Sequence, residues 1–294
     1  MRGGHGLSAM VAIAAVASLG GVAVAAEITG TNENDTRFGT PQADTMDGRH
    51  GDDKLFGEGG NDTINGGPDS DTASGGPGND RILGANCEVG EVGRLCDNPG
   101  HEKLSGGPGN DTILANACVT SFCAYDNYIA LDSTYSGGPG ADKIIGADGR
   151  DVMRGGDGRD QLKGVRAADR IFGGPDLDKI VGGGGSDVLV GGGGPDRIKG
   201  RAGDDQVIGG RGRDRLWGTD GDDVVRGGVG RDRVKGGPGL DRLFGGPAND
   251  RIYARDGKRD VVDCGPGEND VAFVDSLDEV SGCERVYERE QDAD

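Results

Sequence analysis

The sequence predicts an all-β solenoid, because its residues repeat with a period of nine and its composition does not suit a conventional core. Thirteen consecutive aspartates, from Asp142 to Asp250, are spaced nine residues apart within the stretch 137–253. A glycine stands five residues before each of them, and an apolar residue stands two residues after each. With 62 glycines among 294 residues and only 33% hydrophobic residues, the chain can bury apolar side chains only by stacking its repeats.

Each nine-residue unit divides into a turn and a short strand. The glycine-rich hexapeptide suits turns that need positive φ, and the three residues after it have an apolar middle residue. Such a triplet predicts a strand whose middle side chain points inward and whose flanking side chains point outward. Two units then close one coil, so residues two units apart stack at about 4.8 Å from coil to coil.

Stacking places the aspartates in columns, and the carboxylates in a column repel one another. Two charges about 5 Å apart repel by about 3 kcal/mol at an effective dielectric constant of about 20. One small inward side chain per unit cannot offset that repulsion along a whole column. A hard cation removes it, and the carbonyl groups of the glycine-rich turns supply further oxygen ligands, a set that suits Ca²⁺. We therefore expect several calcium ions to hold the fold together.

Three units carry a family resemblance. GGPGNDRIL (75–83), GGPGNDTIL (106–114) and GGGGSDVLV (182–190) resemble the RTX, or hemolysin-type, calcium-binding nonapeptide GGxGxDxUx. The resemblance extends over most of residues 30–262. It implies a right-handed parallel β-roll, in which aspartate carboxylates and turn carbonyls bind Ca²⁺ between turns that are two units apart.

The resemblance also implies which residues bind the ions. Asp187 and Asp205 would share an ion on one side of the roll, and Asp196 and Asp214 would share one on the other. The aspartates that we predict as calcium ligands are Asp44, Asp53, Asp62, Asp71, Asp80, Asp111, Asp142, Asp151, Asp160, Asp178, Asp187, Asp196, Asp205, Asp214, Asp223, Asp232, Asp241 and Asp250. Arginine directly precedes the aspartate in some units and could compete with the metal as a counter-charge: Arg150, Arg159, Arg213 and Arg231.

The chain divides into five predicted regions. An apolar run rich in alanine and valine follows Arg2 and indicates a signal peptide that is cut near Ala25 or Ala26. The regions are a signal peptide (1–26), a first repeat array (27–83), two cysteine-containing insertions around one repeat (84–136), the main array (137–262), and a C-terminal cap and tail (263–294). We expect a secreted protein, free or held at the cell surface, without a membrane span.

Six cysteines favour disulfides, because they are even in number and closely spaced in a protein expected to be exported. They fall as Cys87 and Cys96, Cys118 and Cys123, and Cys264 and Cys283. Fifteen connectivities are possible, and we expect local pairing. A zinc site is the rival interpretation, although no CxxC motif is present. A bridge between the last pair would close the cap, in which alternating Val271, Phe273 and Val274 predict a last strand before a frayed tail from Glu284.

Two intervals of 31 residues interrupt the period, from Asp80 to Asp111 and from Asp111 to Asp142. Each equals three units plus four residues, which predicts two related loop excursions. The second excursion is rich in aromatic residues: Phe122, Tyr125, Tyr128 and Tyr135. Loops on a rigid scaffold often carry recognition. The simpler interpretation is that these loops fold over an edge of the solenoid.

Odd and even units should present opposite outer faces. One face of the main array is basic and carries Lys143, Lys163, Lys179, Arg197, Lys199, Arg215, Arg233, Lys235 and Arg251. The other is more apolar and carries Val152, Phe172, Val188, Val190, Ile208, Val224 and Phe244. These faces suit an anionic cell-surface polymer and another protein. The simpler alternative is that the basic side chains offset the acidic turns and discourage aggregation. The net charge of −19 argues against nucleic acid as the main partner.

Residue types that carry catalysis are scarce. His50 and His101 are the histidines outside the predicted leader, and GxSxG, HExxH and P-loop motifs are absent from the sequence. We therefore predict a secreted calcium-binding protein with calcium-dependent folding, a structural or surface-interaction role and no catalysis. Two alternatives stay open: an adhesin-like module that binds an anionic polymer, a glycan or ice, and the remnant of a secreted hydrolase.

Overall fold

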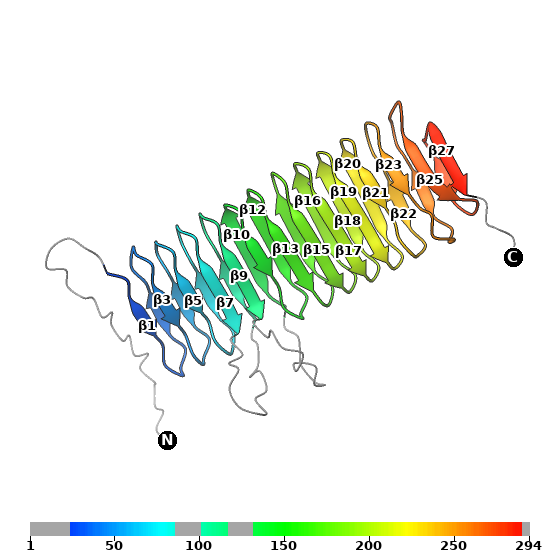
Figure 1. Ribbon diagram of the computed structural model, residues 1–294. Helices are drawn as coiled ribbons and strands as arrows, with labels where there is room; N and C mark the ends of the chain where they lie inside the picture. Colours follow the sequence, from blue (N-terminus) through cyan, green and yellow to red (C-terminus); the bar gives the residue numbers. More distant parts are fainter. Residues whose placement is uncertain (1–23, 86–100, 117–131, 290–294) are drawn as a thin grey trace, which may run out of the picture.

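The computed structural model describes residues 24–85, 101–116 and 132–289, which form an elongated solenoid (Figure 1). Its 27 strands lie in two sheets, with 14 odd-numbered strands in sheet A and 13 even-numbered strands in sheet B. This confirms the predicted all-β parallel roll. The described part of the chain contains no helix, and so none long and apolar enough to cross a membrane. The predicted signal peptide lies outside the described residues except for its last three positions.

The strands are short and follow one another along the chain. Those of sheet A are β1 (Glu27–Thr29), β3 (Thr45–Asp47), β5 (Thr63–Asn65), β7 (Arg81–Ala85), β9 (Thr112–Asn116), β11 (Lys143–Ile145), β13 (Gln161–Val165), β15 (Lys179–Gly184), β17 (Arg197–Ala202), β19 (Arg215–Asp220), β21 (Arg233–Lys235), β23 (Arg251–Tyr253), β25 (Val271–Asp275) and β27 (Arg285–Arg289). Those of sheet B are β2 (Thr36–Phe38), β4 (Lys54–Phe56), β6 (Thr72–Ser74), β8 (Lys103–Ser105), β10 (Thr134–Pro139), β12 (Val152–Asp157), β14 (Arg170–Gly174), β16 (Val188–Gly193), β18 (Gln206–Arg211), β20 (Val224–Val229), β22 (Arg242–Phe244), β24 (Val261–Asp263) and β26 (Glu279–Ser281).

Every strand pairs in parallel with the strand two further along, as expected if two units make one coil. In the main array the register is 18 residues, so that Ile180 of β15 lies beside Ile198 of β17. Around the insertions the register is 31 residues, and Ile82 of β7 lies beside Ile113 of β9. The pairing therefore continues across both long intervals without a break.

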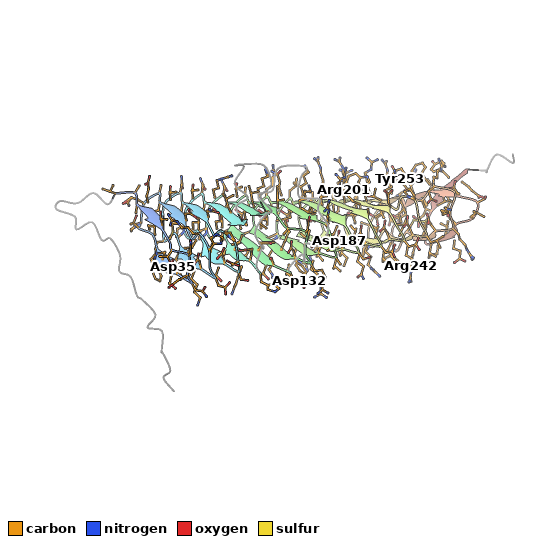
Figure 2. All side chains as sticks on the ribbon, turned by 90° about the horizontal axis from the view of Figure 1, so that it is seen from below. Asp35, Asp132, Asp187, Arg201, Arg242 and Tyr253 are labelled. Atoms are coloured by element: carbon orange, nitrogen blue, oxygen red, sulfur yellow. A yellow bond between two sulfur atoms is a disulfide. The ribbon has the colours of Figure 1, made fainter. Side chains whose placement is uncertain are left out.

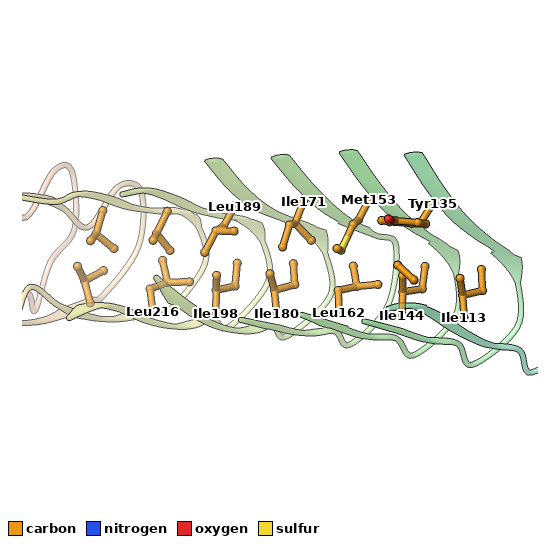
Figure 3. Packing of buried hydrophobic residues seen from close by; sticks show 14 of the residues in the cluster. Ile113, Tyr135, Ile144, Met153, Leu162, Ile171, Ile180, Leu189, Ile198 and Leu216 are labelled. Atoms are coloured by element: carbon orange, nitrogen blue, oxygen red, sulfur yellow. The ribbon is translucent and has the colours of Figure 1, made fainter. Parts of the chain in front are cut away.

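The core consists of the inward-facing middle residue of each strand. Figure 3 shows these side chains in two facing rows, one from each sheet, and every labelled one is buried. Burying one such side chain is worth about 1.5–3 kcal/mol. Only one of nine residues contributes in this way, so the core is one side chain deep on each sheet. The turns must therefore supply the remaining cohesion.

Most turns contain two positions with left-handed backbone, four and two residues before the aspartate. Gly192 and Gly194 before Asp196 have φ of 114° and 92°. A Cβ atom at either of these two glycines would overlap a backbone carbonyl of the preceding coil, so both conformation and space favour glycine there. Val165 occupies the first position with φ of 129°, a strained conformation for a β-branched residue.

The region 84–136 contains more of the solenoid than the single predicted repeat. Strands β8 and β10 belong to sheet B and flank β9, so the coils continue through this region. Tyr135 was expected in a loop, but that expectation was wrong, because Tyr135 is the fully buried inward residue of β10. The predicted pairs Cys87 with Cys96 and Cys118 with Cys123 lie outside the described residues and stay predictions.

The C-terminal end departs from the nonapeptide but keeps the coil. The predicted bridge between Cys264 and Cys283 is confirmed, with Cα atoms 5.1 Å apart. The strand predicted from Val271 is β25, yet it is not the last, because β26 and β27 follow. The tail was expected to fray from Glu284, and this was wrong for β27, which pairs with β25 over five residues. One reason is an aromatic column in which Phe273 stacks on a tyrosine on either side.

Candidate metal centre

The repeat aspartates form two rows along the edges of the solenoid, one at the turns that lead into each sheet. All the predicted ligands are at most 3% exposed. Figure 2 shows Asp187 between the two outer faces. Row A, before the strands of sheet A, comprises Asp44, Asp62, Asp80, Asp111, Asp142, Asp160, Asp178, Asp196, Asp214, Asp232, Asp250 and Asp270. Row B, before the strands of sheet B, comprises Asp35, Asp53, Asp71, Glu102, Ser133, Asp151, Asp169, Asp187, Asp205, Asp223, Asp241 and Asp260.

One carboxylate oxygen of each row aspartate ties its coil to the preceding one. The backbone N–H of Asp187 donates to Oδ1 of Asp205 at 2.8 Å, and that of Asp196 donates to Oδ1 of Asp214 at the same distance. In row A this bond repeats without interruption from Asp44 to Asp270. The bond fixes the carboxylate in the turn and turns its second oxygen into the coil.

The second oxygen, Oδ2, has no protein partner at most of these positions. Among the 18 predicted ligands, 16 have a buried Oδ2 that accepts no hydrogen bond. The two exceptions are Asp44 and Asp151, whose Oδ2 atoms accept a bond from the backbone N–H of Thr40 and of Ala147. A buried carboxylate oxygen without a partner is costly. A repeated series of them indicates that another group, a cation, belongs there.

At most of these positions a backbone carbonyl from the next coil also lies close to the orphaned Oδ2. Gly173 stands five residues before Asp178. A Cβ atom added to Gly173 would clash with Oδ2 of Asp178 and with the carbonyl oxygen of Gly191. The glycine five residues before the aspartate is therefore needed to leave room for these two oxygens. Carboxylate and carbonyl oxygens from adjacent coils are ligands that suit Ca²⁺.

The donor set is mostly backbone. No group of three or more histidine, cysteine, aspartate or glutamate side chains that could hold a metal is found among the described residues. Each coil contributes one row carboxylate to each edge, so any further ligands there must come mainly from carbonyl oxygens. Calcium accepts carbonyl ligands readily, whereas a zinc site would need nitrogen or sulfur side chains. The donor chemistry thus fits calcium.

Burial raises the pKa of most of the row carboxylates in the metal-free chain, Asp187 and Asp196 among them. Loss of hydration is the main cause, hydrogen bonds to the backbone oppose it, and repulsion from neighbouring carboxylates adds to it in many of them. The pKa rises to about 8 for Asp196 and to about 6 for Asp187. The ionised form is therefore disfavoured without a counter-charge. A bound divalent cation would supply one.

At the N-terminal end of row B an arginine takes the place of such a cation. Arg37 stands where an apolar residue is expected in β2, and its guanidinium lies 2.9 Å from the carboxylate of Asp35. The arginines that were expected to compete with metal behave differently. Arg150 pairs with Asp132 at 2.9 Å, and within the described ranges neither Arg213 nor Arg231 forms an ion pair. The row aspartates of the main array have no protein cation beside them.

Sequence reasoning missed three carboxylates that complete the rows. Asp169, Asp260 and Asp270 are buried, and each has an orphaned Oδ2. Asp169 was in the nine-residue series, but Ala167 replaces a glycine in its turn. Asp260 and Asp270 follow one-residue insertions that shift the count. The last two are identified as row positions by their hydrogen bonds across coils. The backbone N–H of Asp241 donates to Asp260 at 2.8 Å, and that of Asp250 donates to Asp270 at 2.6 Å.

Row B contains two substitutions beside the insertions. Glu102 replaces one aspartate, and neither of its buried carboxylate oxygens accepts a hydrogen bond. Burial raises the pKa of Glu102 to about 9, and repulsion from Asp71 adds to the effect. Ser133 replaces the next aspartate, and its hydroxyl accepts the N–H of Glu102 at 3.0 Å. The series of hydrogen bonds between coils is therefore interrupted at Glu102. It continues at Ser133 through a hydroxyl group instead of a carboxylate.

The two parallel sheets and the buried carboxylate rows define a β-solenoid that is stabilised by cations in its turns. The sequence matches the RTX calcium-binding nonapeptide repeat over residues 29–86, 98–118 and 132–258. The chain therefore belongs to the RTX calcium-binding nonapeptide repeat family, whose repeats bind Ca²⁺, and its metal is calcium. Comparison with curated proteins gives no match.

Proposed function

We propose that this chain is a secreted structural protein that folds when calcium fills its turns, and that it acts through its surface without catalysis. The observation that carries the proposal is the series of buried, unpartnered Oδ2 atoms along both rows. Without metal these carboxylates lose hydration and repel their neighbours, and the thin apolar core offsets little of that cost. With calcium the same oxygens become the strongest cohesive contacts between coils.

The proposed ligands are the 18 aspartates that the repeat predicts, extended by Asp169, Asp260 and Asp270. Within this set Asp187 and Asp205 are proposed to share an ion at row B. The support is their convergence with turn carbonyls of the adjacent coil and their lack of other partners. Asp35 is left out of the set because Arg37 already supplies its counter-charge.

Three observations support secretion and a role without catalysis. The bridge between Cys264 and Cys283 is of a kind that persists in oxidising compartments. The apolar run after Arg2 has the character of a leader. RTX repeats occur typically in extracellular proteins and are structural or associated with toxins rather than catalytic. The buried carboxylates are also committed to holding coils together, which leaves them poorly placed for chemistry on a substrate.

The test is circular dichroism of the full mature chain during calcium titration, with reversal by EDTA. We expect a cooperative gain of β-strand signal as calcium is added and its loss on chelation. Calorimetry should report several ions per chain, and magnesium at equal concentration should be much less effective because it demands a stricter geometry. A chain that stays equally ordered after chelation, with no metal retained by elemental analysis, would contradict the proposal.

A further inference from the structure

A groove of about 510 Å³ runs along row A on the C-terminal half of the solenoid. Exposed arginines dominate its wall. Six of them belong to the main array, Arg197, Arg213, Arg215, Arg231, Arg233 and Arg251, and Arg285 of β27 lines the groove as well. The buried aspartates of row A line the same groove, and the amides of Asn249 and Asn269 lie at its C-terminal end. Figure 2 shows Tyr253 of sheet A and Arg242 of sheet B on opposite outer faces, so the basic residues after row A occupy one face of the molecule.

The arginines are aligned along the solenoid. Arg197, Arg215, Arg233 and Arg251 are the first residues of β17, β19, β21 and β23, and each lies directly beside the next in the parallel register. Adjacent strands are about 4.8 Å apart. Four guanidinium groups therefore repeat at the coil spacing, with Arg213 and Arg231 in a second column two residues earlier in the repeat.

These arginines do not serve as counter-charges to the row. The ion pairs found within the described ranges involve none of the six. In other coils the residue directly before the row aspartate accepts a backbone N–H from an adjacent coil, as Asn110 does from Ala141 at 2.7 Å. Arginine has no acceptor, so Arg213 and Arg231 give up that bond. The placement of Arg213 and Arg231 favours an external anion over a structural role, whereas Arg233 also packs over the ring of Tyr253 and donates to its hydroxyl at 3.3 Å.

We propose that this groove binds a linear acidic polysaccharide that carries carboxylate groups at intervals near one sugar unit. Arginine forms two parallel hydrogen bonds with a carboxylate, and a sugar unit in an extended glycan advances by a length comparable to the coil spacing. The amides of Asn249 and Asn269 can bond to hydroxyl groups. This inference rests on the proposed function, because calcium bound at Asp196, Asp214, Asp232 and Asp250 removes the negative charge that would otherwise offset four of the groove's arginines.

Nucleic acid fits the groove less well. Single strands need free aromatic faces on which bases stack. The groove lining contains no aromatic residue among those described, and Tyr253, Phe273 and Tyr287 on the same face stack on one another. The net charge of −19 opposes long-range attraction of any polyanion, the proposed polysaccharide included, so local, directional contacts must select the ligand.

The test measures binding of a short galacturonate oligomer to the full mature chain by calorimetry, with calcium in constant excess. A short oligomer keeps its own association with calcium small. We expect saturable binding, and we expect the pair Arg215→Gln with Arg233→Gln to raise Kd by about tenfold or more, since hydrogen bonds to charged groups are among the stronger ones. The control pair is Arg170→Gln with Arg242→Gln. These residues occupy the same repeat position on sheet B and should leave Kd unchanged.

Several results would overturn the inference. The first is that a protein shown by circular dichroism to be folded does not bind the oligomer saturably. The second is that the two pairs of substitutions raise Kd for the oligomer equally. The third is that the protein binds polyphosphate or single-stranded DNA of matched length with equal affinity. Circular dichroism of the same samples with and without calcium reports separately on the proposed function. A chain ordered without calcium would therefore count against that function and would not be confused with a failure to bind the glycan.

Discussion

Row A and row B run along opposite edges of the same solenoid, yet only row A keeps a carboxylate in every coil from Asp44 to Asp270. Both insertions enter the chain between a strand of sheet A and the following turn of row B. At those two turns the glycine-rich hexapeptide is missing. Row B holds Glu102 and Ser133 there, whereas row A retains Asp111 and Asp142 in the same coils.

This difference between the rows indicates that the aspartate of a row position occurs together with the glycine-rich turn before it. At most row positions that keep the glycine five residues before them, the carboxylate lies beside a carbonyl of the next coil. In the sequence the fifth residue before Glu102 is Asp97 and the fifth before Ser133 is Tyr128, so the glycine of the repeat is absent from both segments. Parallel strand pairing survives the loss, because backbone bonds and the inward residue Tyr135 still join the coils.

The largest effect on the stability of the metal-free chain should come from lowering the pH, because protons neutralise the carboxylates of both rows at once. In the metal-free chain the folded pKa values are raised, to about 6 for Asp187 and about 8 for Asp196, above an unfolded value of about 4. The stability that these groups contribute is therefore complete below pH about 4 and is lost as the pH rises through 6 to 8. We expect circular dichroism in calcium-free buffer to show more strand structure at pH 5 than at pH 8.

The calcium-loaded protein provides the control for this pH series. Protons and calcium compete for the same oxygens, so the affinity for calcium should rise between pH 5 and pH 8 while the loaded chain stays folded. A metal-free chain that is equally disordered at both values, or more ordered at pH 8, would show that carboxylate charge is not what opposes folding.

A smaller effect should follow from removing two charges in the intact row A, with Asp196→Asn and Asp214→Asn. Asparagine keeps the acceptor for the backbone N–H but loses the anionic oxygen, so calcium should dissociate from these sites. At a calcium concentration about a hundredfold above Kd each lost site costs about 2.7 kcal/mol of stability. We expect the melting temperature to fall in calcium and to rise in its absence, because two buried charges are gone.

The control changes two exposed aspartates at the opposite edge, Asp204→Asn and Asp222→Asn, which directly precede the row B positions Asp205 and Asp223. Their side chains also accept backbone N–H groups across coils, at 2.9 and 2.8 Å, and asparagine preserves those bonds. The control should therefore leave both melting temperatures and the number of bound ions nearly unchanged. If the control and the row A pair behaved alike, net charge alone would account for the effect.

Much of this architecture could be predicted because a single nine-residue period sets both the coil and the burial pattern. The inward residues such as Ile180, the alternation of faces and the positions of the row aspartates all follow from that count. Asp260 and Asp270 were missed because single-residue insertions shift the count, while the hydrogen bonds that hold them join coils rather than neighbours in sequence. Counting along the chain cannot detect a contact that only stacking creates.

The break in row B was hidden for a different reason. Glu102 and Ser133 follow segments without the glycine pattern, so nothing local identifies them as row positions. Only the pairing of β8 with β6 and β10 shows that they continue the coil. The arginine groove likewise depends on register, since residues 18 apart become neighbours only after two units close a coil.

The smallest effect on stability and calcium binding is expected for Ser133→Asp. This substitution restores a row B carboxylate but not the glycine-rich turn before it. The new side chain can still accept the N–H of Glu102, but its second oxygen would lack the glycine pocket that the other row positions possess. We expect no additional calcium ion by calorimetry and a loss of roughly 1 kcal/mol in stability, because a buried charge is left without a partner. The control is Ser136→Asp, one residue past the inward Tyr135 and paired in register with Arg154. It changes the net charge equally on the outer face and should be nearly neutral. A gain of one bound ion in Ser133→Asp alone would show that a row carboxylate suffices without the glycine turn, and the two rows would then differ only by sequence drift at two positions.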